Sequence, residues 1–264
     1  MTQNLYRINI NAADIRAKAK FKSERTTQAL YNEPVEIIKT GDDYCLVKLH
    51  DGYKGYVKKV FLSRDGADSG ELYIIKAPLT PAYSAPNEQA PILTMLPFAA
   101  ELKAHPESDL FMGTHSSRYG DIFLKCADLI PATERPRLTK ETVPQMLEIA
   151  HKFMGIPYLW GGRTYFGCDC SGYVNVILKY FGLTLPRKTK DQVKFGRKVP
   201  YGDIEVGDLL FFRIHVGIAL NKSEYIHCSL SEGGVRINTL DPNQKGYLRF
   251  RDLSLRAVRR FIAS

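Results

Sequence analysis

The stretch of sequence that decides the fold reads YLWGGRTYFGCDCSGY and runs from Tyr158 to Tyr173. It contains the only tryptophan of the chain, and glycines precede its two cysteines. Helical periodicity begins at Cys170, so we expect a helix from Cys170 to about Tyr180 that ends at Gly182. Unsatisfied N–H groups and the helix dipole at that start stabilise a thiolate and a developing oxyanion. The segment therefore predicts that Cys170 is a nucleophile in a cleft rather than an inert buried thiol.

Two histidines further along can complete such a site. His215 opens an apolar run, and His227 follows 12 residues later. That distance is the reach of a β-hairpin, so two adjacent antiparallel strands can carry both imidazoles. We expect His215 to be the general base and His227 to orient it. The second ring nitrogen of His215 needs a hydrogen-bond partner that fixes the tautomer and the orientation of the ring.

A zinc site is the chemical alternative for the same part of the chain. Its ligands would come from Cys168, Cys170, His215, His227 and Cys228. The Cys-x-Cys spacing differs from the Cys-x2-Cys of zinc knuckles, and a glycine-rich approach suits a substrate cleft better. We therefore favour the nucleophilic cysteine.

Five motifs, taken in order, resemble the NlpC/P60 family of cysteine peptidases. They are Trp160-Gly161-Gly162, Asp169-Cys170-Ser171-Gly172, Gly207-Asp208-Leu209, His215-Val216-Gly217-Ile218 and the later His227. The resemblance covers about residues 140–264, and within the family the chain is similar to the γ-D-glutamyl-L-diamino acid endopeptidases of the dipeptidyl-peptidase VI type. It implies an α+β, papain-like domain in which the cysteine, at a helix start, packs on an antiparallel sheet that carries the histidines.

The resemblance also implies roles for residues around the nucleophile. Tyr158 falls where the family places a tyrosine near the oxyanion. Asp169 and Ser171 flank the nucleophile where these endopeptidases hold the free L-Ala end of the substrate. Because a buried ammonium needs a compensating carboxylate, we expect Asp169 and Glu24 to bind it together and to be unpaired in its absence. The full set of substrate-binding residues implied in this domain is Trp160, Asp169, Ser171, Arg187 and Thr189, the last two lying in Leu185-Pro186-Arg187-Lys188-Thr189.

The first third of the chain reads as a small β-barrel. Strand-like runs at 35–38, 44–49 and 53–57 are separated by turn signals. The family places bacterial SH3-like modules ahead of the catalytic domain, and the first one caps the cleft with a Glu and a Tyr. Glu24 and Tyr56 are the candidates here, with Tyr53 as a rival; many relatives have Trp at the position of Tyr56.

A degenerate second copy is expected over residues 72–130, where Ile92–Leu96 repeats Ala29–Tyr31 and Asp121–Cys126 repeats Gly55–Val60. The proline-containing segment 131–139 reads as a linker. Beyond it, one helical face is predicted from Met146, Ile149, Ala150, Phe153 and Met154, and strands follow after Gly207. We therefore expect three domains, at 1–66, 67–131 and 132–264.

Composition limits the partners. The net charge is +9, but the basic residues do not gather into a stripe with interleaved aromatics, so we expect no nucleic-acid partner. No apolar run approaches the roughly 18 residues of a membrane helix, and the start has no apolar signal-peptide core. Five cysteines without a disulfide framework favour a reducing compartment. We expect a cytoplasmic monomer; a periplasmic or secreted protein is the alternative if a leader has been removed.

The sequence thus predicts an enzyme without a cofactor. We expect it to cleave the γ-D-Glu–diamino acid bond in murein tripeptides and tetrapeptides with a free L-Ala, in the recycling of cell-wall peptides. An endopeptidase on intact peptidoglycan stems is the first alternative. A wall-binding protein with SH3-like modules and a silent catalytic domain is the second.

Overall fold

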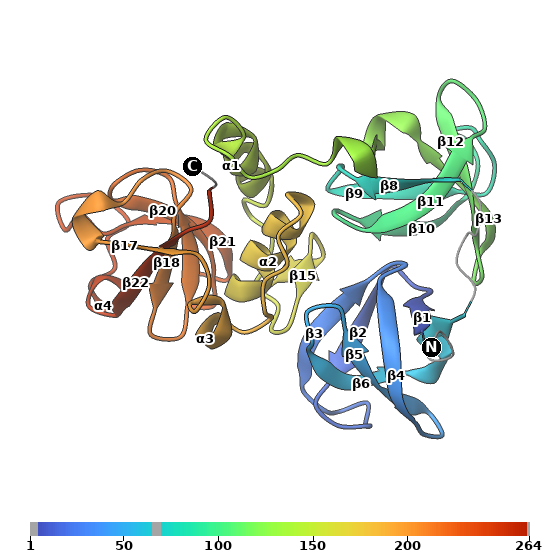
Figure 1. The fold of residues 1–264 in the computed structure, drawn as a ribbon, viewed down its shortest axis with the longest axis horizontal. Coiled ribbons are helices and arrows are strands. Elements are labelled where there is room, and N and C mark those ends of the chain that lie inside the picture. The colour runs from blue at the N-terminus through green and yellow to red at the C-terminus, as the bar shows by residue number, and fades with distance from the viewer. Residues whose placement is uncertain (1–4, 65–69, 263–264) are drawn as a thin grey trace. The chain divides into compact units, whose positions relative to one another are not determined.

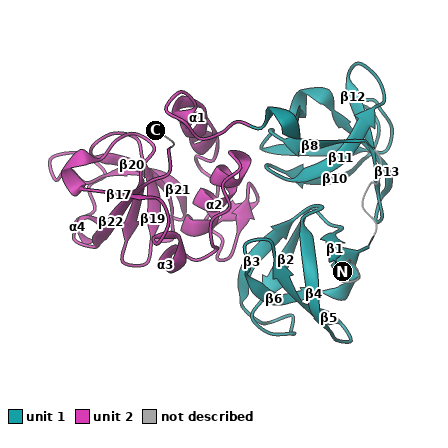
Figure 2. Cartoon of the chain, in the orientation of Figure 1, with its two compact units in different colours: residues 1–135 teal, residues 136–264 magenta. Residues whose placement is uncertain are grey.

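The chain forms two compact units, residues 1–135 and 136–264 (Figure 2). The computed structural model describes residues 5–64 and 70–262. The division between Arg135 and Pro136 falls inside the segment 131–139, where the sequence predicts a linker. None of the helices in these described ranges is long and apolar enough to span a bilayer.

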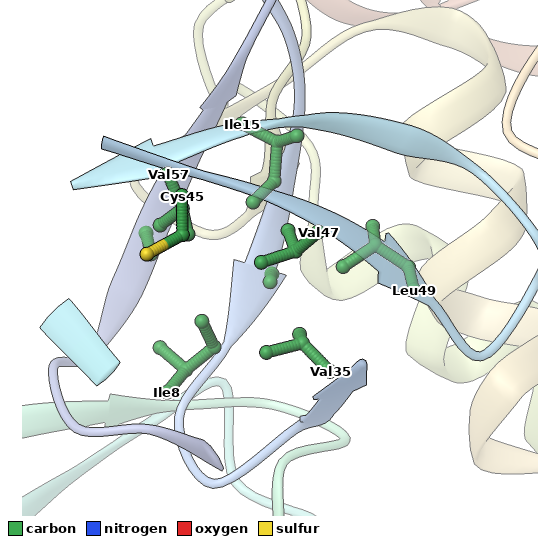
Figure 3. Packing of buried hydrophobic residues seen from close by; sticks show 9 residues of the cluster. Ile8, Ile15, Val35, Cys45, Val47, Leu49 and Val57 are labelled. Atoms are coloured by element: carbon green, nitrogen blue, oxygen red, sulfur yellow. The ribbon is translucent and has the colours of Figure 1, made fainter. Parts of the chain in front are cut away.

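The first seven strands of the chain form one antiparallel sheet with the order β3-β2-β6-β5-β4-β1-β7 (Figure 1). Their bounds are β1 Leu5–Ile8, β2 Ala12–Arg16, β3 Arg25–Leu30, β4 Pro34–Thr40, β5 Tyr44–Leu49, β6 Lys54–Lys58 and β7 Leu62–Ser63. Alternate residues of β5, namely Cys45, Val47 and Leu49, point to one side because successive side chains of a strand face opposite ways. They meet Ile8 and Val57 in a buried core (Figure 3).

The next seven strands form a second sheet with the order β10-β9-β13-β12-β11-β8-β14. Their bounds are β8 Glu71–Ile75, β9 Leu79–Tyr83, β10 Ile92–Pro97, β11 Glu101–Pro106, β12 Phe111–Ser116, β13 Gly120–Lys125 and β14 Leu129–Pro131. This is the order of the first sheet with each strand number raised by seven. The turns after β3 and β10 match as well, since each places a non-glycine residue in the left-handed region: Asn32 with φ 58° and Ala99 with φ 61°.

The second unit is built on a six-stranded antiparallel sheet with the order β17-β22-β18-β19-β20-β21. Its strands are β17 Arg197–Val199, β18 Leu209–Phe212, β19 Val216–Ala219, β20 Glu224–Ser229, β21 Gly234–Thr239 and β22 Leu255–Arg260. The helices are α1 Val143–Lys152, α2 Cys170–Tyr180, α3 Thr189–Gln192 and α4 Arg249–Asp252, and a short ribbon pairs β15 Arg163–Thr164 with β16 Gly167–Cys168. Helix α2 contacts β19 and β20. The mixed helix and strand content confirms the predicted α+β class.

Helix α1 is shorter than the sequence pattern predicts. It ends at Lys152, and the chain leaves it through Gly155 with φ 82°. Met146, Ile149 and Ala150 are buried, but Met154 is 42% exposed. Met154 is therefore not part of the buried face, because the helix has ended before it.

The Gly207-Asp208-Leu209 motif has a structural role in this sheet. Asp208 is fully buried, and its two oxygens accept hydrogen bonds from Nε and Nη2 of Arg260 at 2.7 and 2.8 Å. Arg260 ends β22, the strand that pairs with β18. The bidentate ion pair therefore fixes the loop before β18 to the neighbouring strand.

Candidate active site

The candidate site begins at the start of helix α2, where the backbone is packed unusually closely. A Cβ atom on Gly172 would overlap the carbonyl oxygen of Gly162, and one on Gly162 would overlap that of Gly167. Only glycine fits at both positions. The glycines of the Trp160-Gly161-Gly162 and Asp169-Cys170-Ser171-Gly172 motifs therefore let the segment before the helix lie directly against its first turn.

Asp169 is the N-cap of this helix. Its Oδ1 accepts from the backbone N–H of Gly172 at 2.7 Å and from the Ser171 hydroxyl at 3.2 Å. Its Oδ2 accepts from the N–H of Gly161 at 2.9 Å and from Nη2 of Arg187 at 2.6 Å. Four donors occupy the four lone-pair positions of the carboxylate. The expectation that Asp169 is an unpaired carboxylate is wrong, because the buried guanidinium of Arg187 already neutralises it.

Arg187 joins three of the predicted substrate-binding residues into one cluster. It is buried, and its Nη1 donates to the hydroxyl of Ser171 at 2.7 Å while Nη2 binds Asp169. A charge-assisted pair of this kind, taken out of water, is costly to break by removing one partner. The structure therefore brings Asp169, Ser171 and Arg187 together at the helix start.

Cys170 is the first residue of α2 and is 8% exposed. Burial, followed by the negative charge of Asp169, raises the pKa of its thiol to about 11, although the N–H of Val216 and the Thr189 hydroxyl act in the opposite direction. The Sγ atom lies 4.0 Å from Oγ1 of Thr189. Burial outweighs the helix start here, so the thiol stays protonated at neutral pH and needs a base to take its proton.

The two histidines lie on adjacent antiparallel strands, as their spacing predicts. His215 stands immediately before β19, and His227 lies in the middle of β20, which pairs with β19. Nε2 of His215 is 2.6 Å from Nδ1 of His227, and the two rings meet edge to face at 87°. Burial lowers the pKa of both rings, that of His227 to about 4. Both imidazoles are therefore neutral near pH 7.

Asn238, which no sequence motif indicates, continues this line of hydrogen bonds. Its Oδ1 is 2.5 Å from Nε2 of His227, and it lies on β21, diagonal to His227 on the same face of the sheet. Its Nδ2 donates to the carbonyl oxygen of Gly246 at 2.8 Å. Asn238 is one of three polar residues in the six-residue strand GVRINT, and nothing in that pattern singles it out.

A second missed residue is Arg251 in α4. Its guanidinium carbon lies 5.9 Å from the ring centroid of Phe212, and that ring is 5.8 Å from the ring of His215. After burial, its positive charge contributes to the lowered pKa of His227. Its distance from the motifs along the chain gave no reason to place it here.

Tyr158 and Trp160 lie on the segment before the helix. Tyr158 forms a β-bridge with Cys168, and burial, then the neighbouring Cys170, raises the pKa of its phenol. Its hydroxyl is therefore a neutral donor. Trp160 is 57% exposed, so its indole is available to a ligand at the surface of this unit.

The cysteines of the zinc alternative have protein partners. The thiol of Cys228 donates to the carbonyl oxygen of Cys168 at 2.9 Å, and both residues are buried. Within the ranges 5–64 and 70–262, no three His, Cys, Asp or Glu side chains are grouped as metal ligands. The two histidines point at each other and at Asn238 instead.

Glu24 and Tyr56 both lie in the first unit, beside the end of β2. Arg16, the last residue of β2, is paired with Tyr56, and the N–H of the next residue, Ala17, donates to the carbonyl of Glu24. The rival tyrosine, Tyr53, packs against the barrel core. Tyr56 is therefore the better neighbour for Glu24, and their predicted role in capping the cleft stays a prediction.

Comparison with known proteins agrees with this geometry. Residues 155–251 match the NlpC/P60 family, and residues 11–63 match the bacterial SH3 domain. The chain is 30% identical over 234 residues to the gamma-D-glutamyl-L-lysine dipeptidyl-peptidase of Bacillus subtilis (strain 168), covering 81% of this chain and 75% of that protein.

The chain belongs to the NlpC/P60 family. This NlpC/P60 protein is a cysteine peptidase with a bacterial SH3 domain ahead of its catalytic domain. A crystal structure of an NlpC/P60 family protein from Bacillus cereus has the same fold, with a TM-score of 0.84 at 21% identity over 98% of this chain and all of that one. The probable endopeptidase NlpC of Escherichia coli (strain K12) is 41% identical over 90 residues, 31% of this chain and 58% of that protein.

Proposed function

We propose that this peptidase cleaves the bond between γ-D-Glu and the diamino acid in murein peptides that begin with a free L-Ala. The observation that carries the proposal is the match to a gamma-D-glutamyl-L-lysine dipeptidyl-peptidase over 81% of this chain, well beyond the catalytic domain. A dipeptidyl-peptidase removes two residues from a free amino terminus, and L-Ala-γ-D-Glu is such a unit.

In this proposal Cys170 is the nucleophile, His215 the base and His227 its orienting partner. His215 takes the proton of the Cys170 thiol as sulfur attacks the γ-carbonyl carbon. The oxyanion is held by N–H groups at the start of α2 and by the neutral phenol of Tyr158. His215 then gives the proton to the leaving amine, and water hydrolyses the acyl-enzyme.

The substrate would lie against the cluster at the helix start. Ser171, Arg187 and Thr189 stand around the thiol, and Trp160 offers an exposed ring. Since Arg187 already neutralises Asp169, this pair presents little net charge to the ammonium group of L-Ala. Glu24 of the first unit remains a carboxylate proposed for that ammonium, because an unpaired ammonium in a closed site is costly.

An endopeptidase on intact peptidoglycan stems remains the second candidate. It is favoured by the E. coli relative, a probable endopeptidase, but that match covers only 31% of this chain. The relative that also spans most of the first unit carries the dipeptidyl-peptidase name. The first unit therefore favours the free-amine substrate, and with it a recycling role on imported peptides. The free state of all five cysteines suits a cytoplasmic enzyme.

We also propose that residues 70–131 are a second, diverged copy of the SH3-like barrel. The identical strand order and the matching left-handed turn residues support this. It would brace the first barrel, since Nδ2 of Asn32 donates to the carbonyl of Glu101 at 2.8 Å.

The test is hydrolysis of L-Ala-γ-D-Glu-L-Lys with and without an acetyl group on the L-Ala nitrogen. We expect kcat/KM to fall on acetylation by more than the roughly 10–200-fold that one methylene can deliver. A comparable kcat/KM for both peptides would contradict this proposal and favour an endopeptidase that acts on intact peptidoglycan stems.

A further inference from the structure

We propose that Asn238 is a positioning residue of this site: anchored by the main chain at Gly246, its amide decides which nitrogen carries the proton in both histidines. The inference deepens the proposed function, since it rests on the roles of His215 and His227 given there. It follows from the directions of three hydrogen bonds, two of which join buried side chains.

The orientation of the Asn238 amide is fixed by what surrounds its nitrogen. The carbonyl of Gly246 can only accept, so the group 2.8 Å from it must be the Nδ2 amine. The carboxylate of Glu232, 3.4 Å from the same nitrogen, is also an acceptor. A flipped amide would place Oδ1 against two acceptors, so Oδ1 must face His227.

This orientation sets the tautomer of His227. The neutral ring carries one proton, and Nε2, 2.5 Å from an oxygen that only accepts, must hold it. Nδ1 of His227 is therefore left with a lone pair. The ring is fully buried, so no water competes for that nitrogen.

The tautomer of His215 follows in the same way. Its Nε2 lies 2.6 Å from the Nδ1 lone pair of His227 and so carries the proton. Nδ1 of His215 is left unprotonated. That is the form a general base needs in order to accept the proton of the Cys170 thiol.

The reverse orientation would switch the base off. If Asn238 offered its amine to His227, Nδ1 of His227 would carry the proton and donate to His215. Nδ1 of His215 would then be protonated and unable to accept from the thiol. The orientation of the Asn238 amide thus decides whether Nδ1 of His215 can accept the proton of the Cys170 thiol.

Two charged groups, Glu232 and Arg251, lie near His227. Glu232, between β20 and β21, has Oε2 3.6 Å from Nε2 of His227 and favours the same tautomer. Arg251 on α4 disfavours the charged, doubly protonated form of the ring, and His215 is neutral. Glu232 is therefore the one neighbour among the described residues that can share the role of Asn238, and the test must separate the two.

The test reads the tautomers directly, by ¹⁵N–¹H correlation of the ring nitrogens in the ¹⁵N-labelled full-length protein. We expect both His215 and His227 of the wild type to carry hydrogen on Nε2. Asn238→Leu should give His227 a mixture of tautomers, and the double variant Asn238→Leu/Glu232→Gln a larger one. Asn238→Asp keeps an oxygen on Nε2 and should keep the wild-type tautomer of His227, at a cost in stability because its second oxygen faces the carbonyl of Gly246.

Kinetics supply the second readout. Asn238→Leu should lower kcat on L-Ala-γ-D-Glu-L-Lys with little change in KM, by between about 10- and 10⁴-fold, the upper figure being the cost of a wrong tautomer in a triad. Asn175→Leu is the matched control, because Asn175 is also buried and also donates to a main-chain carbonyl, that of Leu185 at 2.8 Å. It should cost stability but leave both histidine tautomers unchanged.

The outcomes distinguish this inference from the proposed function. An Nδ1–H tautomer in either wild-type ring, or unchanged tautomers in the folded Asn238→Leu variant, would overturn the inference. A change that appears only when Glu232 is also replaced would assign the role to Glu232 and overturn it too. If the wild type does not hydrolyse the tripeptide but its tautomers respond as expected, the proposed substrate is wrong and the role of Asn238 stands.

Discussion

Cys170 enters the reaction as a protonated thiol, because burial raises its pKa to about 11. We expect Cys170→Ala to abolish hydrolysis while the protein stays folded, since losing the nucleophile removes essentially the whole catalysed rate. Hydrolysis is followed by release of L-Ala-γ-D-Glu, and folding by circular dichroism.

Cys168, two residues earlier, is the control for this variant. Its thiol is buried, and the residue contributes its carbonyl to Cys228. Cys168→Ala should keep most of the activity. Near wild-type turnover by Cys170→Ala would instead refute the assignment of the nucleophile.

The raised pKa also predicts the pH dependence of Cys170 alkylation. The thiolate is the reactive form, and a thiol with a pKa near 11 is mostly protonated below that value. Labelling of the Cys170 peptide by iodoacetamide, followed by mass spectrometry, should therefore keep rising from pH 7 towards pH 11. A plateau reached already below pH 8 would show that the thiolate is stabilised in the free enzyme.

The two histidines should differ in what their loss costs. His215→Ala should leave no detectable turnover, because this ring moves the proton. His227→Ala should leave some turnover, because His227 only sets the tautomer and the orientation of the His215 ring. Removing such an orienting residue can still lower the rate by up to roughly 10⁴-fold. Steady-state rates of both variants check this; a more active His215→Ala would reverse the assignment.

At the scale of the element, the start of α2 depends on backbone packed against backbone. Gly172→Ala should lower the free energy of unfolding by about 1–3 kcal/mol or more, since the added methyl group meets the rigid carbonyl of Gly162. Urea unfolding followed by fluorescence measures it. Gly202→Ala, where the added atom meets nothing within 4 Å, should change stability by less than about 1 kcal/mol, and equal losses for both variants would contradict the packing argument.

Some elements of the second unit were predictable from the sequence and others were not. The boundaries of α2 were predictable because Asp169 and Gly182 are local signals, and the hairpin that carries the histidines was predictable from spacing. No apolar run marks strand β22, because three of its six residues are arginines; pairing with β18 holds it in the sheet. The pairing of Asp169 with Arg187 joins residues 18 apart, and no local pattern encodes it.

At the scale of the whole molecule, each unit has its own sheet or sheets and its own core. We expect residues 136–264, expressed alone, to fold and to keep the reactivity of Cys170 towards iodoacetamide. Without Glu24 and Tyr56, the discrimination between free and acetylated L-Ala peptides should shrink at least about tenfold. Equal discrimination by the isolated unit and the full chain, measured as the ratio of kcat/KM values, would remove the first barrel from substrate selection.

The anchor of Asn238 has a consequence for how this enzyme can be controlled. Gly246 belongs to the turn between β21 and α4, where residues 242–246 are all exposed. The tautomers of both histidines therefore depend on a peptide carbonyl in a surface loop that contains none of the proposed substrate-binding residues. An antibody fragment bound to this loop, or proteolytic cleavage after Lys245, should therefore lower kcat and leave the affinity for the peptide substrate unchanged.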